Sequence, residues 1–358
     1  MSMVYHGGRV FEASRFLGKP PHEILDFSSN LNDFFPFEVV EEILRRHLQW
    51  LKYYPDVNHA LESLSRFLGL PLEKIAVGSG SVDLLFKAFL ALSPKRVLLP
   101  VPSFPEYERA AQAVGAQVLT FPLNKEEGFE IQVERLLEVA LSGIDLLVLC
   151  NPHNPTGTFL AEKELLSIIE TLGKRGVWVL VDEAFVDFVS PGQKPDLLPF
   201  LEKGRRLLVL RSLTKALSVP GLRLGYLIGP EEFLRKLQAL TPPWQIGSLG
   251  QVLLEHIGDV WRVFEEGLPE FYRERERFKQ ELSKKFKVYP TEGNFFFLEV
   301  GDPLLPIKLY QKGILVRGGE GFRGFPEGFI RVAVKLPSKN DILLKTLEEV
   351  CNAPEGTP

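Results

Sequence analysis

The sequence predicts an α/β fold with a large domain, whose mostly parallel sheet is sandwiched by helices, and a smaller α+β domain formed from both termini. Three observations indicate this. Short runs rich in Val and Leu alternate with longer amphipathic segments through the middle of the chain. The stretches on either side of that middle lack the alternation. The length of 358 residues leaves room for more than one domain.

Five apolar runs predict the strands of the large sheet, at 74–80, 96–102, 145–152, 177–185 and 206–212. The runs are apolar on both faces, which is typical of strands that helices cover on both sides. Helical spacing occurs between them at 82–92, 106–116 and 162–176. Alternation of strands and helices favours a parallel sheet.

The two ends of the chain predict the smaller domain. Residues 1–48 carry short mixed elements, and a helix-rich stretch follows a proline-containing break at 241–248. Three strand-like runs, "NFFFLEV", "GILVRGG" and "GFIRVAV", precede a closing helix at 339–350 and a loose tail at 352–358. We expect the large domain to span 49–244, and the small domain to combine 1–48 with 245–358.

Composition excludes several classes of partner. Lys and Arg number 42 against 46 Asp and Glu, and no basic block occurs, so we expect no nucleic-acid partner. No run reaches membrane-spanning length and no secretory leader is recognisable, so we expect a cytoplasmic protein without a membrane partner. The two cysteines fit a reducing compartment, and the six histidines form no metal-binding pair.

Polar or glycine-rich residues follow each predicted strand of the large sheet. They are "GSGS" at 78–81, "PSF" at 102–104, "NPHNPTG" at 151–157, "DE" at 182–183 and "SLTK" at 212–215. Ligands of open α/β sheets lie outside the carboxyl ends of the strands, so these residues should meet at one site. Each motif alone also has a structural reading, such as a glycine turn or a helix cap at Asp182. Five such exits from one sheet favour a functional site.

Some of these motifs carry specific chemistry. Asn151 and Asn154 can donate amide hydrogen bonds from a backbone that two prolines restrict. A buried carboxylate at Asp182 is costly unless it pairs with a positive group, such as a protonated ring nitrogen of a cofactor. "GSGS" suits a phosphate but lacks the rest of a dinucleotide fingerprint, which excludes a nicotinamide-dependent dehydrogenase.

Together these motifs resemble the pyridoxal-phosphate enzymes of the aspartate aminotransferase superfamily (fold type I) over nearly the whole chain. The motifs are "NPHNPTG", "DEAF", "SLTK" with an arginine eight residues after its lysine, and "FIRVAV". The resemblance implies pyridoxal 5'-phosphate as cofactor, with Lys215 as the catalytic residue bound to its aldehyde carbon. It also implies that Asp182 meets the ring nitrogen, that Asn154 meets the 3-oxygen, and that Phe104 stacks on the ring.

The same resemblance implies how anionic groups are bound. The cofactor phosphate would contact Gly80, Ser81, Ser212, Thr214 and Arg223. Tyr54 of "YYPD" would reach the cofactor of the neighbouring subunit in a homodimer with shared sites, although ordinary surface packing explains this residue equally well. Arg331 would bind the substrate carboxylate. A substrate phosphate would bind His6, Arg317 and Arg323, with Asn154 also close to the substrate.

Two branches of the superfamily match best, the L-threonine-O-3-phosphate decarboxylases and the histidinol-phosphate aminotransferases, and both act on a small phosphorylated amino compound. The segments "YHGGRVFEASRFLG", "ILDFSSNLN" and "PPW" favour the decarboxylases. Phe185 does too, because aminotransferases commonly carry tyrosine there. Without that hydroxyl, we expect a raised pKa of the lysine–cofactor linkage.

Other readings remain open. "RGGEGFRG" and "LNDFFP" depart from the usual decarboxylase forms. The alternative is therefore a histidinol-phosphate aminotransferase or a related transaminase with 2-oxoglutarate as acceptor. A non-enzymatic binder is also conceivable, but it would have little reason to keep Lys215, Asp182 and Arg223 together.

Overall fold

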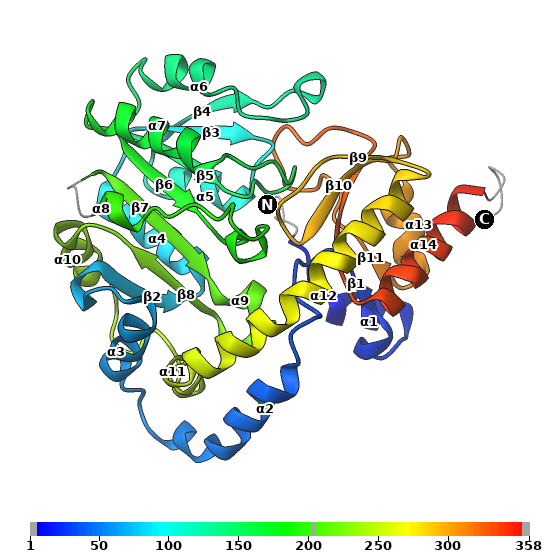
Figure 1. The fold of residues 1–358 in the computed structure, drawn as a ribbon, viewed down its shortest axis with the longest axis horizontal. Helices are drawn as coiled ribbons and strands as arrows, with labels where there is room; N and C mark the ends of the chain where they lie inside the picture. The colour runs from blue at the N-terminus through cyan, green and yellow to red at the C-terminus, as the bar shows by residue number, and fades with distance from the viewer. Residues whose placement is uncertain (1–5, 202–204, 353–358) are drawn as a thin grey trace.

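A computed structural model describes residues 6–201 and 205–352, and a seven-stranded sheet forms its larger part (Figure 1). The strand order is β2-β8-β7-β6-β5-β3-β4. Every neighbouring pair is parallel except those of β8, which runs antiparallel to both β2 and β7. The strands are β2 (Ile75–Ser79), β3 (Arg96–Val101), β4 (Gln117–Pro122), β5 (Leu146–Cys150), β6 (Trp178–Asp182), β7 (Leu207–Ser212) and β8 (Leu224–Ile228). The predicted mostly parallel sheet is confirmed.

All five predicted strands are present, but the sequence analysis missed two others. β4 lies at the edge of the sheet, and only Phe121 among its residues is fully buried, so its pattern lacks the continuous apolar character of the inner strands. β8 is completely buried, but it directly follows a Pro-Gly break and Arg223. These residues, together with Lys215, led the sequence analysis to treat the segment as part of the anion site and not as a strand. Its reversed direction brings the chain straight back beside β7.

Helices cover both faces of this sheet, as the apolar strands predicted. Alternate strand residues point to opposite layers, so Leu146 and Val148 pack with the helices on one face, and Leu147 and Leu149 with those on the other. The first face is covered by α4 (Ser81–Leu92), α5 (Pro105–Ala113) and α10 (Glu231–Ala239). The second is covered by α6 (Val133–Ala140), α7 (Glu162–Gly173), α3 (Val57–Leu68) and α11 (Ser248–Glu255).

The smaller part joins the two ends of the chain. β1 (Leu25–Asp26) pairs in parallel with β11 (Ile314–Leu315), and a second sheet has the order β12-β10-β9. Its strands are β9 (Lys287–Val288), β10 (Phe295–Glu299) and β12 (Phe329–Ala333), with the helices α1 (Val10–Leu17), α13 (Leu305–Gln311) and α14 (Pro337–Asn352) beside them. Both termini therefore build this part, whereas the domain boundaries at 48/49 and 244/245 stay a prediction. Most of the predicted loose tail lies outside the described residues.

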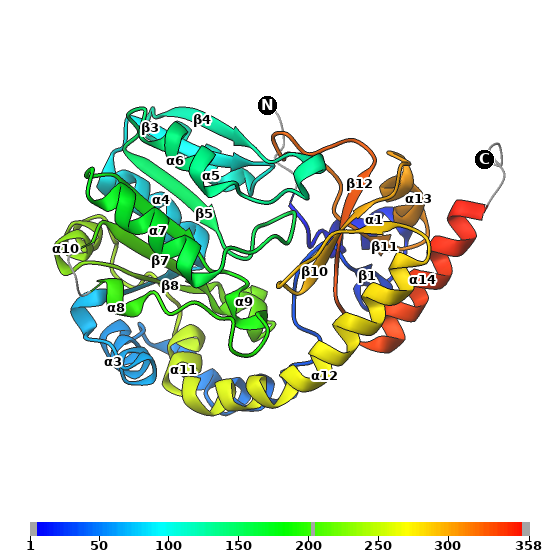
Figure 2. The ribbon, with the colours of Figure 1, turned by 45° about the horizontal axis from the view of Figure 1, so that its top comes forward.

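A long helix connects the two parts. α12 (Ile257–Ser283) starts beside α11 and ends next to α14 and the small sheet (Figure 2). α2 (Phe37–Arg46) also lies between the two parts, while α8 (Leu198–Leu201) and α9 (Leu213–Ala216) are single turns flanking β7. In residues 6–201 and 205–352, every helix is too short or too polar to cross a bilayer.

Candidate active site

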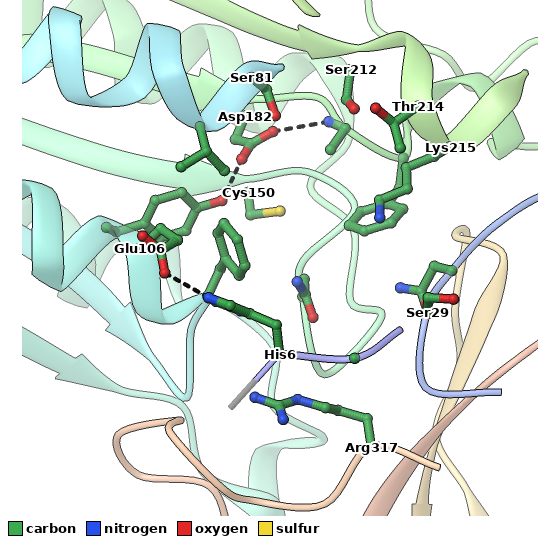
Figure 3. Close-up of a pocket in the computed structure, with 18 of the residues that line it drawn as sticks. His6, Ser29, Ser81, Glu106, Cys150, Asp182, Ser212, Thr214, Lys215 and Arg317 are labelled. Carbon is green, nitrogen blue, oxygen red and sulfur yellow. Dashed lines mark hydrogen bonds and ion pairs between the residues drawn. The ribbon is translucent and has the colours of Figure 1, made fainter. Parts of the chain in front are cut away.

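A cavity of about 500 Å³ lies where the inner strands of the large sheet end and the small part begins (Figure 3). Its volume suits a small-molecule ligand. The strand exits converge there as the sequence predicted, together with residues from both ends of the chain. The predicted site residues that line it are His6, Ser81, Phe104, Asn154, Asp182, Ser212, Thr214, Lys215, Arg223, Arg317 and Arg331.

Lys215 provides an amine on the single turn α9, directly after β7. Burial lowers the pKa of Lys215 to about 8, and the positive charges of Arg331 and Arg223 act in the same direction. A large fraction of the amine is therefore neutral near pH 8. A neutral amine attacks an aldehyde carbon, whereas an ammonium group does not.

Asp182 ends β6 and provides a buried carboxylate at the cavity. Tyr107 donates a hydrogen bond of 2.6 Å to its Oδ2, and the Ala184 N–H donates one of 3.0 Å to its Oδ1. Burial raises the pKa of Asp182 to about 6, although these hydrogen bonds and the charge of Lys215 oppose the rise. The carboxylate is thus charged at neutral pH and can pair with a protonated ring nitrogen.

Hydroxyl groups at the start of α4 and around α9 form a cradle for an anion. Among the described residues, the side-chain oxygens of Ser81, Ser212 and Thr214 have no hydrogen-bond partner, and Arg223 has no acidic partner. Gly80 precedes α4 with φ of 83°, and a Cβ there would lie 2.5 Å from Nη2 of Arg223. The glycine therefore lets the guanidinium approach the positive end of a helix, an arrangement typical of phosphate binding.

Arg331 reaches the opposite side of the cavity from β12. Its Nη1 donates to Oδ1 of Asn154 at 2.5 Å, and its Nη2 donates to the carbonyl oxygen of Ser28 at 2.6 Å. Its buried Nε has no partner among the described residues. Burial lowers the pKa of Arg331 to about 9, and the charge of Arg317 contributes to the decrease. A buried guanidinium without an acidic partner is completed by an anionic ligand.

Arg317 lies next to Arg331, because the backbones of these two residues are hydrogen-bonded to each other. Its guanidinium donates to the carbonyl oxygen of Glu320 at 2.6 Å and lies 4.6 Å above the centre of the Phe322 ring. Burial lowers the pKa of Arg317 to about 10. Within residues 6–201 and 205–352, neither arginine forms an ion pair with a carboxylate.

Comparison with known proteins assigns the chain to a family. The family of class I and II aminotransferases matches residues 22–347. The chain belongs to that family. Its enzymes depend on pyridoxal phosphate, so pyridoxal 5'-phosphate is the cofactor, and the resemblance found in the sequence is confirmed.

The relatives of this aminotransferase-family chain include both a threonine-phosphate decarboxylase and a histidinol-phosphate aminotransferase. It is 32% identical to a threonine-phosphate decarboxylase of Salmonella typhimurium over 96% of each chain. It is 34% identical to a histidinol-phosphate aminotransferase of Caldanaerobacter subterraneus, over 88% of this chain and 90% of the relative. A histidinol-phosphate aminotransferase from Sinorhizobium meliloti, solved in complex with pyridoxal-5'-phosphate, shares the fold with a TM-score of 0.85 at 19% identity, over 97% of this chain and 95% of that one.

The residues of this aminotransferase-family site fit pyridoxal phosphate. The cradle of unpaired hydroxyls and Arg223 matches the phosphate, and the amine of Lys215 matches the aldehyde. The charged Asp182 matches the ring nitrogen. When bound, the cofactor supplies an electron-poor ring that stabilises negative charge on the α carbon of an amino substrate.

Three predicted residues of the aminotransferase-family site do not line the cavity. Gly80 contributes through the space that it leaves for Arg223. Tyr54 is 76% exposed and stacks on Trp244 with ring centres 4.1 Å apart, so its role across a subunit interface stays a prediction. Arg323 forms an ion pair of 3.0 Å with Glu108 on α5.

The cavity also contains residues that the sequence analysis missed. Tyr107 follows Phe104 by three residues, a spacing that places both on one side of a helical turn. Cys150 is the last residue of β5, so the strand-exit rule alone would have found it. Ser28 and Glu106 gave no such signal, because their neighbours at the cavity, His6 and Arg331, are distant in sequence.

Proposed function

We propose that this enzyme decarboxylates L-threonine O-3-phosphate to aminopropanol phosphate, a step of cobamide synthesis. The observation that carries the proposal is the pair of buried arginines, Arg317 and Arg331, neither of which has an acidic partner among the described residues. Two adjacent guanidinium groups call for a substrate with two anionic groups. L-threonine O-3-phosphate carries a carboxylate and a phosphate. Histidinol phosphate carries a phosphate only, and in its reaction the second guanidinium would bind a carboxylate of the acceptor 2-oxoglutarate.

In this proposal Arg331 binds the substrate carboxylate, and Asn154 and Ser28 keep its guanidinium in place. Arg317 and His6 bind the substrate phosphate, and Arg323 joins them if it leaves Glu108. When bound, the cofactor would weaken one bond of the α carbon, and the orientation of the substrate would select which one. Arg331 and the phosphate site would hold the substrate so that the bond to the carboxylate is selected.

Acid–base chemistry falls to Lys215 and Asp182. Loss of carbon dioxide leaves an electron pair on the α carbon, and a proton must take the place of the carboxylate. The amine of Lys215, with a pKa lowered to about 8, can hold that proton and deliver it near neutral pH. Asp182 keeps the ring nitrogen protonated, and Tyr107 fixes the orientation of this carboxylate.

The alternative is transamination of histidinol phosphate with 2-oxoglutarate as acceptor. The relative at 34% identity supports it, and in that case Arg331 would bind a carboxylate of the acceptor. Phe185 favours the decarboxylase. Its ring is buried at the cavity and packs edge-on against Phe295 with centres 5.0 Å apart, so it offers no hydroxyl to the cofactor.

A direct assay tests the proposal. Protein loaded with pyridoxal phosphate is given L-threonine O-3-phosphate without a keto acid, and aminopropanol phosphate is sought by mass spectrometry. Its formation, abolished by Lys215→Ala, supports the decarboxylase. No product there, together with turnover of histidinol phosphate that requires 2-oxoglutarate, would establish the aminotransferase instead.

We further propose a cytoplasmic homodimer in which Tyr54 contacts the cofactor phosphate of the partner. The exposed aromatic pair of Tyr54 and Trp244 supports this assembly, because large exposed aromatic side chains are enriched at interfaces. Sedimentation of the loaded protein tests it, and a monomer at all concentrations would contradict it.

A further inference from the structure

We propose that Glu106 is a positioning residue for the substrate phosphate, because it holds the ring of His6 at the cavity so that this ring can bind the phosphate. The inference rests on the proposed function in one respect only, which is that the substrate is phosphorylated. Glu106 lies in the first turn of α5 and lines the cavity, but it belongs to none of the motifs of the strand exits.

Glu106 contacts two basic side chains, one from the start of the described chain and one from α5. One of its oxygens lies 2.8 Å from Nε2 of His6. Nη1 of Arg109, one helical turn further along α5, donates to both carboxylate oxygens at 2.8 and 2.9 Å. Burial on its own raises the pKa of Glu106, but the hydrogen bonds and charges of His6 and Arg109 bring it below its ordinary value. The carboxylate is therefore charged, and Arg109 fixes the direction in which it faces His6.

The start of the described chain contacts both parts of the molecule. The Gly8 N–H donates to Oγ of Ser28 at 2.9 Å, which attaches this segment to the small part of the molecule. Gly7 is packed so closely on Ser28 that a Cβ would lie 2.2 Å from its carbonyl oxygen. His6 extends from this anchor to α5 of the large part, and its side chain is still 43% exposed. Among the described residues, Glu106 is its only acidic partner.

The contact with Glu106 leaves one ring nitrogen of His6 available for a ligand. Glu106 accepts from Nε2, so Nδ1 is available, and within residues 6–201 and 205–352 it has no hydrogen-bond partner. Figure 3 shows His6 between Glu106 and Arg317, with all three facing the cavity. With Nε2 facing the carboxylate, Nδ1 is the ring nitrogen through which His6 can donate to a phosphate. Glu106 therefore acts on the phosphate through His6.

A purely structural role predicts something different. If the bond between Glu106 and Arg109 only stabilised the first turn of α5, its loss would weaken every ligand of the cavity alike. A positioning role through His6 affects only ligands that carry the phosphate, and only while His6 is present.

The test measures the affinity of the loaded enzyme for L-threonine O-3-phosphate and for L-threonine. The absorbance of the bound cofactor reports the binding of each compound. We expect Glu106→Gln to weaken binding of the phosphorylated compound about tenfold, the size expected when a charge-assisted hydrogen bond becomes a neutral one, and that of L-threonine less than about twofold. In a His6→Ala background the same substitution should add no further loss. Equal weakening of both ligands, or additive losses, would overturn the proposal.

A second His–Glu contact, outside the cavity, provides a matched control. His59 and Glu255 form another His–Glu contact of 2.8 Å, between α3 and α11 and outside the cavity. Glu255→Gln should leave both affinities unchanged. Unaltered cofactor absorbance and melting temperature of each variant show that it has folded and loaded.

The ratio of the affinities for the phosphorylated and the unphosphorylated compound is also measured with histidinol phosphate and histidinol. This second pair distinguishes a failure of the role of Glu106 from a failure of the decarboxylase assignment. If Glu106→Gln lowers the preference for phosphate only in that pair, the role of Glu106 stands and the decarboxylase assignment fails. If the unmodified enzyme prefers the phosphorylated form and Glu106→Gln retains that preference in full, the role of Glu106 alone fails. An unmodified enzyme without any preference for phosphate would refute both.

Discussion

Replacing Asp182 by asparagine should make the cofactor-free protein more stable while it impairs the enzyme. Asp182 is only 5% exposed, and burial raises its pKa from 3.8 to about 6. The folded protein thus binds this proton more tightly than the unfolded chain does. The stability gained from the proton is complete below pH 3.8 and is lost as the pH rises through about 6. Above that pH the cofactor-free fold contains an unfavourable buried charge.

The magnitude follows from the pKa difference. About two pKa units correspond to about 3 kcal/mol at pH 7.5, and the same linkage gives about 1 kcal/mol at pH 4.5. An amide at position 182 has a similar shape and carries no charge. Its oxygen can accept from the Ala184 N–H, and its amino group can donate to the oxygen of Tyr107. The difference between variant and unmodified protein should therefore grow by about 2 kcal/mol between pH 4.5 and 7.5.

Urea unfolding of the two cofactor-free proteins at both pH values, at one protein concentration, measures this growth. How well the amide packs does not affect it, because a packing term is the same at both pH values. A difference that stays constant with pH, or that shrinks as the pH rises, would refute the reasoning. Asp259→Asn on the exposed side of α12 is the control, and its effect should stay within about 0.5 kcal/mol at both pH values. With cofactor bound, the unmodified protein should be more stable than Asp182→Asn, since the amide cannot neutralise a protonated ring.

Three further predictions concern the cofactor. Phe185→Tyr should lower the pKa of the lysine–cofactor linkage, as seen in an absorbance titration, and an unchanged pKa would refute the argument from the missing hydroxyl. Gly80→Ala should weaken cofactor binding about tenfold or more in equilibrium dialysis, because the new methyl group meets Arg223 at a backbone φ of 83°; Gly221→Ala, which meets nothing within 4 Å, is the control. Tyr54→Phe should weaken cofactor binding without changing the assembly state measured by sedimentation, whereas an unchanged affinity would mean that this tyrosine serves surface packing only.

Strand exits made most of the cofactor site predictable. Asp182 and Ser212 are the last residues of strands whose apolar runs are unmistakable, Lys215 comes three residues after the second of these strands, and the sheet itself brings them together. The edge strand β4 escaped because its exposed face lacks that signal. The reversed strand β8 escaped because a turn and two charged residues surround it.

Contacts between distant parts of the chain could not be predicted from the sequence. Asn154 and Arg331 were assigned separately, and only the fold shows that one holds the other. His6 and Glu106 meet because the start of the chain crosses to α5. Arg323 lies six residues after Arg317, but it turns away to Glu108, since loop geometry and not spacing decides its direction.

The pairing of β1 with β11 imposes an order on the folding of the protein during its synthesis. Residues 25 and 26 have no strand to join until the ribosome has added residue 315. The residues around Lys215 that fit the cofactor lie within 80–223, and β8, the last strand of their sheet to be synthesised, ends at Ile228. At 5–20 residues per second, Arg331 follows Arg223 after roughly 5 to 20 s. With the proposed roles, a nascent chain contains its own residues for pyridoxal phosphate well before it contains Arg331 for the substrate.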